Sequence, residues 1–62
     1  MAGKFVLTKD AAGEFRFTLV ASNGEVIASS EGYSQKGAAQ NGIDAVRKFA
    51  VEAVVDDQTP RD

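Results

Sequence analysis

The first half of the chain alternates between apolar and polar residues with a period of two. The clearest stretch covers residues 14–21, where Phe15 and Phe17 are separated and flanked by polar side chains. Such alternation is typical of a β-strand with one buried face. Shorter β-type runs over residues 4–9 and 25–30 flank this stretch. The pattern therefore predicts three strands.

Turn-forming residues separate the three predicted strands. Residues 10–13 begin with Asp and end with Gly, and both residue types favour turns. The pair Asn23-Gly24 follows the second strand and is a strong hairpin signal, because it tolerates the positive φ angles of a tight turn. We therefore expect an antiparallel meander.

After Tyr33 the apolar positions recur at helical spacing, which predicts one amphipathic helix over residues 35–49 with Ser34 as its N-cap. Gly42 inside a helix costs about 1 kcal/mol relative to Ala. This cost suggests a close approach of another backbone, and Tyr33 is expected to pack against the first turn. The predicted buried side contains Ala39, Gly42, Ile43, Val46, Phe49 and Ala50.

Residues 51–56 form a short apolar run that predicts a final strand. The order βββαβ is an α+β fold, with an antiparallel sheet and one helix packed on one face. We expect one domain over residues 1–62, ordered over residues 3–57 and followed by a flexible polar tail over residues 58–62.

The size of this fold predicts self-association. A sheet of short strands with one helix buries one face only, and an exposed sheet edge invites pairing with another chain. A final strand this short gains little unless it joins an existing edge. Domains below about 70–80 residues are often supplemented by disulfides, a metal or oligomerisation. A homodimer in which two copies share a sheet meets these needs.

Composition narrows the possible functions. The chain of 62 residues has no Cys and no His, which excludes disulfides, thiolate metal sites, Cys nucleophiles and the commonest general base. We expect no cofactor and no metal. Nine acidic residues against seven basic ones argue against a broad nucleic-acid surface. No apolar run is long enough to span a membrane, and no signal peptide is apparent, so a cytoplasmic protein is expected.

Four segments together resemble the YegP-like family of small bacterial proteins; in order along the chain they are 13–19, 23–27, 30–34 and 41–47. The resemblance implies a βββαβ unit, which many members carry twice in tandem. It also implies that two units build one continuous sheet and exchange their C-terminal strands. No established activity comes with the family.

The chain resembles a member with one unit. The resemblance therefore implies a homodimer with swapped C-terminal strands, with Ala53, Val54 and Val55 at the dimer interface. Two positions depart from the family pattern. Ala45 stands where Ser is more frequent, and Phe49 stands where a polar residue is expected, which can alter packing at the helix end.

The face of the central strand opposite its aromatic residues is a candidate binding surface. Arg16 and Thr18 lie on it, and Ile27 of the next strand is expected beside them. The alternative for Arg16 is a cross-strand ion pair with a neighbouring Glu.

These observations favour a non-enzymatic, homodimeric binding or structural module with an unknown protein partner. The first alternative is nucleic-acid binding through a local basic patch of Lys4, Lys9 and Arg16 on the exposed sheet face. The second alternative is a small enzyme that uses carboxylates at the dimer interface.

Overall fold

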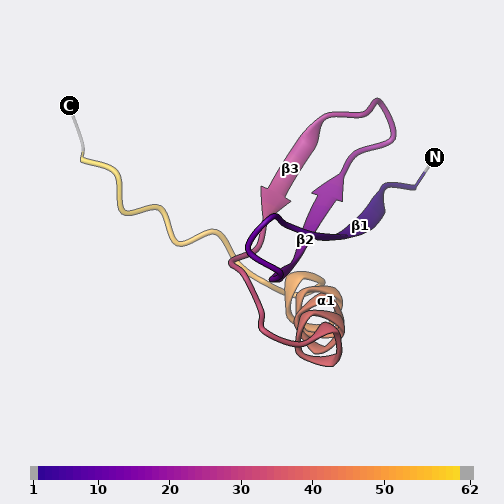
Figure 1. Cartoon of the computed structure of the whole chain (residues 1–62). Helices are drawn as coiled ribbons and strands as arrows, with labels where there is room; N and C mark the ends of the chain where they lie inside the picture. Colours follow the sequence, from indigo (N-terminus) through magenta and orange to yellow (C-terminus); the bar gives the residue numbers. More distant parts are fainter. Residues whose placement is uncertain (1, 61–62) are drawn as a thin grey trace.

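The computed structural model describes residues 2–60, which form a three-stranded antiparallel sheet and one helix (Figure 1). The elements are β1 (Lys4–Lys9), β2 (Phe15–Val20), β3 (Val26–Ser29) and α1 (Lys36–Ala50). The strand order is β1-β2-β3, so β2 is central. The predicted α+β class and the antiparallel meander are confirmed.

Both hairpins are built in the same way. In each, a backbone N–H of Gly13 or Gly24 closes a turn onto the carbonyl three residues earlier, at 3.0 and 2.9 Å. These two glycines have φ angles of 84° and 89°, and they are the residues with positive φ within 2–60. A turn followed by one left-handed glycine is the common three-residue hairpin loop. The Asn23-Gly24 hairpin is thus confirmed, although Gly24 alone of the pair takes a positive φ.

The pairing register decides which side chains share a face of the sheet. Phe5 lies opposite Leu19, and Leu7 lies opposite Phe17. Directly opposed residues of antiparallel strands point to the same side. Together with Phe15 on β2, these side chains form the face that α1 covers. Strands β1 and β2 contribute most of this apolar surface, because β3 adds only Ala28 opposite Leu19.

The core is small and centres on Phe17. Phe17 is 7 % exposed and Ala39 of α1 is fully buried. The rings of Phe17 and Phe5 form a T-shaped pair with a centroid distance of 6.0 Å, and Phe17 stacks with Tyr33 at 6.3 Å. Aromatic pairs at these distances contribute about 0.5–1.5 kcal/mol beyond their buried area. Phe17 therefore joins β1, the β3–α1 connection and the helix.

Tyr33 is fixed beside β2 by two backbone hydrogen bonds. The Phe15 N–H donates to the Tyr33 carbonyl at 2.7 Å, and the Tyr33 N–H donates to the Phe15 carbonyl at 2.8 Å. A Cβ atom at Gly42 would lie 2.7 Å from the Tyr33 hydroxyl and 3.0 Å from the Phe17 ring. The predicted close approach at Gly42 is real, but its nearest partners are two aromatic side chains and not a backbone. Tyr33 accordingly packs against the second turn of α1, at Gly42.

The predicted N-cap at Ser34 is wrong. The N-cap is Gln35, with φ −132° and ψ 144°, and no side chain caps the helix. The Gln35 carbonyl accepts hydrogen bonds from the N–H groups of Ala38 and Ala39 at 3.2 and 3.3 Å. Ser34 stands one residue outside the N-cap position from which a hydroxyl reaches the first-turn N–H groups.

The predicted final strand over residues 51–56 is absent from the chain's own sheet. The helical path continues past Ala50 into a turn, and the Ala53 N–H donates to the Ala50 carbonyl at 3.3 Å. The following residues extend away from the sheet (Figure 1). A strand needs a sheet edge to pair with, and within residues 2–60 the edge strands β1 and β3 each pair with β2 alone. Residues 61–62 of the predicted tail lie outside the described residues.

Two glycines of α1 provide a matched test of the packing at Tyr33. Gly42→Ala is expected to lower the free energy of unfolding by about 1–3 kcal/mol, because the new methyl group overlaps Tyr33 and Phe17. Gly37→Ala meets no atom within 4 Å. It is expected to raise the free energy of unfolding by up to about 1 kcal/mol through helix propensity. Urea unfolding of both variants checks this, and equal effects at the two positions would contradict the role of Gly42.

Candidate functional site

Two surfaces are left uncovered by the fold. The first is the open face, the side of the sheet opposite α1. The second is the C-terminal segment, residues 53–60, which follows the helix. The register assigns to the open face Lys4, Val6, Thr8, Arg16, Thr18, Val20, Val26 and Ser29. This face carries β-branched residues in its middle and charged residues toward its ends.

The register places two of the three predicted open-face residues as expected. Arg16 and Thr18 lie opposite Thr8 and Val6 of β1. Ile27 differs, because the register shifts there: Leu19 pairs with Ala28 and Val20 pairs with Val26. Ile27 falls between these two pairs, in a β-bulge, and is 61 % exposed. It is accessible but stands outside the regular row of the face.

Arg16 is held by acidic partners at the β1–β2 turn. Its Nε atom donates to Asp10 Oδ2 at 2.8 Å, and its Nη2 atom lies 3.9 Å from Glu14 Oε1. Nη1 donates to the Ser30 carbonyl at 3.5 Å. The main partner is thus Asp10, where sequence reasoning named a Glu. Because both nearby carboxylates are negative, Arg16 offers little net positive charge to an anionic ligand.

Asp10 organises the turn from both of its oxygens. Oδ1 accepts from the N–H groups of Ala12 at 3.0 Å and Glu14 at 2.9 Å, while Oδ2 accepts from Arg16. The hydrogen bond from Arg16, followed by that from the Glu14 N–H, holds the pKa of Asp10 below its ordinary value of 3.8. The same hydrogen bond raises the pKa of Arg16. Sequence reasoning missed this role, although Asp at the start of a turn was its signal.

The predicted basic patch is split between the two faces of the sheet. Lys4 and Arg16 lie on the open face. Lys9 pairs with Phe15 on the face that α1 covers, and its ammonium lies 5.5 Å from the Phe15 ring centroid. The three cations therefore do not form one surface for a phosphate backbone.

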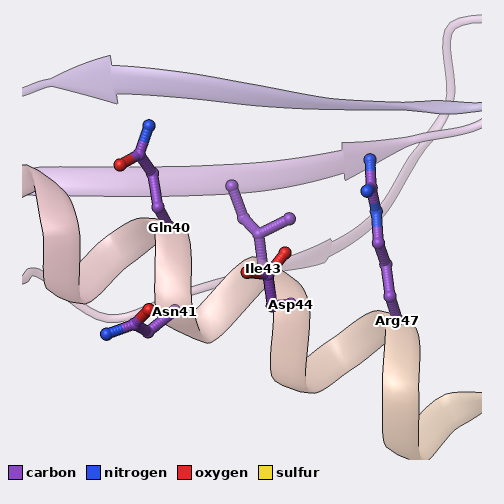
Figure 2. Close-up of a pocket in the computed structure, with 5 residues that line it drawn as sticks. All are labelled: Gln40, Asn41, Ile43, Asp44 and Arg47. Atoms are coloured by element: carbon purple, nitrogen blue, oxygen red, sulfur yellow. The ribbon is translucent and has the colours of Figure 1, made fainter.

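A depression of about 390 Å³ lies along α1, lined by Gln40, Asn41, Ile43, Asp44 and Arg47. Figure 2 shows Gln40, Ile43 and Arg47 pointing toward the strands, with Asn41 directed away from them. Arg47 also lies 5.5 Å from the ring centroid of Phe5. The lining of the depression offers two side-chain amides, one carboxylate and one guanidinium, which suit hydrogen bonding more than proton transfer. Within residues 2–60, no group of three or more potential metal ligands occurs, and no helix has the length and apolar character to cross a membrane.

The C-terminal segment and the end of the helix expose large apolar side chains. Val51, Val54 and Val55 are 80 %, 85 % and 93 % exposed. The predicted burial of Phe49 is wrong: it is 68 % exposed, with the Lys48 ammonium 5.5 Å from its ring centroid. The side-chain hydrogen bonds of the C-terminal segment are local: the Asp56 carboxylate accepts one from Gln58, and the Asp57 carboxylate accepts two from Thr59. Ala53, Val54 and Val55 are therefore exposed and belong to no strand of the described chain.

Asp10 is expected to make stability pH-dependent in the acid range. Because its pKa is lower in the folded state, the stabilisation is present above the ordinary pKa of 3.8 and is lost as the pH falls through the folded-state value. Asp10→Asn keeps an oxygen for the turn but loses the charge. It should remove this part of the acid dependence in thermal melts across pH 2.5–6, a range chosen to span the ordinary Asp value.

Asp10→Ala separates the turn from the ion pair. It loses the bonds to the Ala12 and Glu14 N–H groups as well, so its melting temperature should fall below that of Asp10→Asn at neutral pH. Equal melting temperatures for the two variants would show that the turn bonds contribute nothing.

Comparison with known proteins assigns a family. Residues 10–57 match the family described as a domain of unknown function, DUF1508. A UPF0339 protein from Treponema denticola is 53 % identical over 55 residues, which cover 89 % of this chain and 95 % of that protein. The UPF0339 protein YegP from Shigella flexneri is 51 % identical over 47 residues, which cover 76 % of this chain and 43 % of YegP.

A solved structure supports the fold. The NMR solution structure of a protein from Haloferax volcanii has a TM-score of 0.81 and 37 % identity, covering 90 % of this chain and 95 % of that one. The resemblance drawn from the four motifs is confirmed. The chain belongs to the DUF1508 family, a family of unknown function whose relatives include the UPF0339 proteins and YegP.

Proposed function

We propose that this protein is a non-enzymatic binding module that works as a homodimer, in which residues 53–56 of each copy pair with a sheet edge of the other. The observation that carries the proposal is the exposure of Val51, Val54 and Val55 beside a core in which Phe17 and Ala39 are the buried apolar residues of the described chain. A chain this small rarely gains enough stability from so small a core.

Strand pairing with a second copy would bury the exposed valines and would supplement the small core. Each valine that moves from water into an interface contributes about 1.5–3 kcal/mol. The sheet offers a place for it, because β1 and β3 each pair with β2 alone among residues 2–60. The four residues of β3 are all exposed. An unpaired edge strand presents a row of N–H and C=O groups to an incoming strand.

The length of a relative supports the same arrangement. The residues matched in YegP of Shigella flexneri make up 43 % of that protein, which leaves space for a second unit of similar size. A tandem pair of units and a dimer of single units would bury the same surfaces.

In this proposal the open face binds the protein partner. Two copies that share a sheet would place two open faces, each with Val6 and Thr18 near the centre and Arg16 toward one end, on one side of the dimer. The β-branched middle suits an extended protein surface. Arg16 is already paired with Asp10, so it would orient a partner through its remaining donors.

Molar mass and thermal stability across a dilution series test the dimer. Light scattering should give twice the chain mass of 6.5 kDa at high concentration. The melting temperature should fall by several degrees for each tenfold dilution, which corresponds to about 1.4 kcal/mol of dimer stability. A mass of 6.5 kDa with a melting temperature independent of concentration would overturn the proposal.

The pairing segment is tested by two variants of equal charge. Val54→Lys with Val55→Lys places two charges where the proposal buries two valines, and the dissociation constant of the dimer should rise at least about a hundredfold. Gln58→Lys with Thr59→Lys adds the same charges outside residues 53–56 and should leave the constant within about threefold. The same change in both variants, measured by sedimentation, would contradict the pairing by residues 53–56.

A further inference from the structure

The dipeptide Asn-Gly occurs twice in this chain, in two different settings. Asn23-Gly24 lies in the turn between β2 and β3, and Asn41-Gly42 lies inside α1. We propose that Asn23 is a site of spontaneous covalent modification in the folded protein, and that Asn41 is protected from the same reaction by the helix. The proposal rests on the turn geometry and is independent of the dimer.

The reaction is an intramolecular attack that needs only water as a co-reactant. The backbone nitrogen of Gly24 attacks Cγ of the Asn23 side chain and forms a five-membered imide. The bond from Cγ to Nδ2 breaks, and Nδ2 leaves as ammonia with the proton that the Gly24 nitrogen gives up. Water then opens either C–N bond of the imide, which yields aspartate or isoaspartate. Glycine favours the attack because it has no Cβ to hinder the approach.

The turn leaves Asn23 open to this reaction. Asn23 is exposed, and a Cβ added at Gly24 would meet nothing within 4 Å. Asn23 Oδ1 accepts a hydrogen bond from the Glu25 N–H at 3.0 Å. This bond spans Gly24, so it keeps the side-chain carbonyl near the nucleophilic nitrogen and polarises the carbonyl carbon for attack. The Gly24 N–H is held by one turn bond to the Ala21 carbonyl at 2.9 Å, in an exposed loop where local opening costs little.

The helix gives Asn41 the opposite setting. Gly42 lies in the middle of α1, where its N–H belongs to the helical ladder. Tyr33 and Phe17 pack against Gly42 and hold the backbone there. The backbone rotation that brings the Gly42 nitrogen to Cγ of Asn41 therefore requires the central turns of the helix to open, which breaks the main contact between α1 and β2.

Modification at Asn23 would change the β2–β3 hairpin in two ways. Both products add one negative charge to a formal net charge of −2. Isoaspartate also routes the backbone through the side chain, which inserts a methylene carbon into the turn. The turn adjoins the bulge at Leu19 and Val20, and β3 has four residues, so an altered loop length shifts the pairing of this edge strand.

The two sites in one molecule make the test self-controlled. The folded protein is incubated at mildly alkaline pH, and peptide mapping by mass spectrometry follows the conversion of amide to acid at each Asn, with isoaspartate identified separately. Asn23 should react at least about tenfold faster than Asn41, the ratio that a difference of about 1.4 kcal/mol in local opening produces. In urea, where both segments are unfolded, the two rates should agree within about threefold. Equal rates in the folded protein, a faster rate at Asn41, or a folded-state rate at Asn23 below a tenth of its rate in urea would each overturn the proposal.

A substitution separates the effect of charge from that of the altered backbone. Asn23→Asp carries the added charge with a normal backbone. The fraction of aged protein that contains isoaspartate at position 23 should melt below this variant, and a melting temperature equal to that of Asn23→Asp would exclude an effect on β3.

Discussion

The contact of Phe17 with Tyr33 and Gly42 is the interaction on which the fold depends. Phe17 lies on the central strand, Tyr33 precedes the helix, and Gly42 lies within it, so this one contact joins three parts of the chain. The backbone of Phe17 is held as well: its N–H donates to Ser30 Oγ, and its carbonyl accepts from the Ser30 N–H, both at 2.9 Å. The large ring of Phe17 on β2 and the lack of a side chain at Gly42 on α1 thus together fix the distance between the sheet and the helix.

The close approach at Gly42 limits what else the helix can cover. A helix that lies near β2 buries Ala39 and reaches Phe5 through Arg47, but it leaves most of β3 exposed. The open face receives no cover at all from residues 2–60. The stability of this side of the sheet therefore depends on the strands and their turns. Asp10 contributes to it with both carboxylate oxygens, which accept hydrogen bonds from the β1–β2 turn and from Arg16.

Local chemistry in the sequence was enough to predict most of the fold. Alternation on β2 and the turn residues around it predicted the meander, because period-two patterning and left-handed glycines act within a few residues. The sequence pattern places the start of α1 one residue too early and does not predict that Asp10 is a nearer partner of Arg16 than Glu14, because both depend on how the β1–β2 turn and the β3–α1 connection fold back. The bulge that displaces Ile27 has no signal in the sequence beyond an apolar run.

In the segment after α1, the structure of the single chain differs from what the sequence pattern predicts. The sequence pattern predicts a strand over residues 51–56, but in the chain's own structure residues 51–52 lie in a turn and the residues after them are solvated, with Val54 and Val55 almost wholly exposed. Strand propensity describes a side chain that fits a half-buried pleated surface, so it has no effect until such a surface is beside it. The core around Phe17 cannot supply that surface, because α1 already occupies the apolar face and its exit directs the chain away from both edges. An apolar segment with strand propensity and no sheet edge within reach is what a chain needs in order to pair with a second copy, so the proposed association would follow from the same close packing that holds the helix to β2.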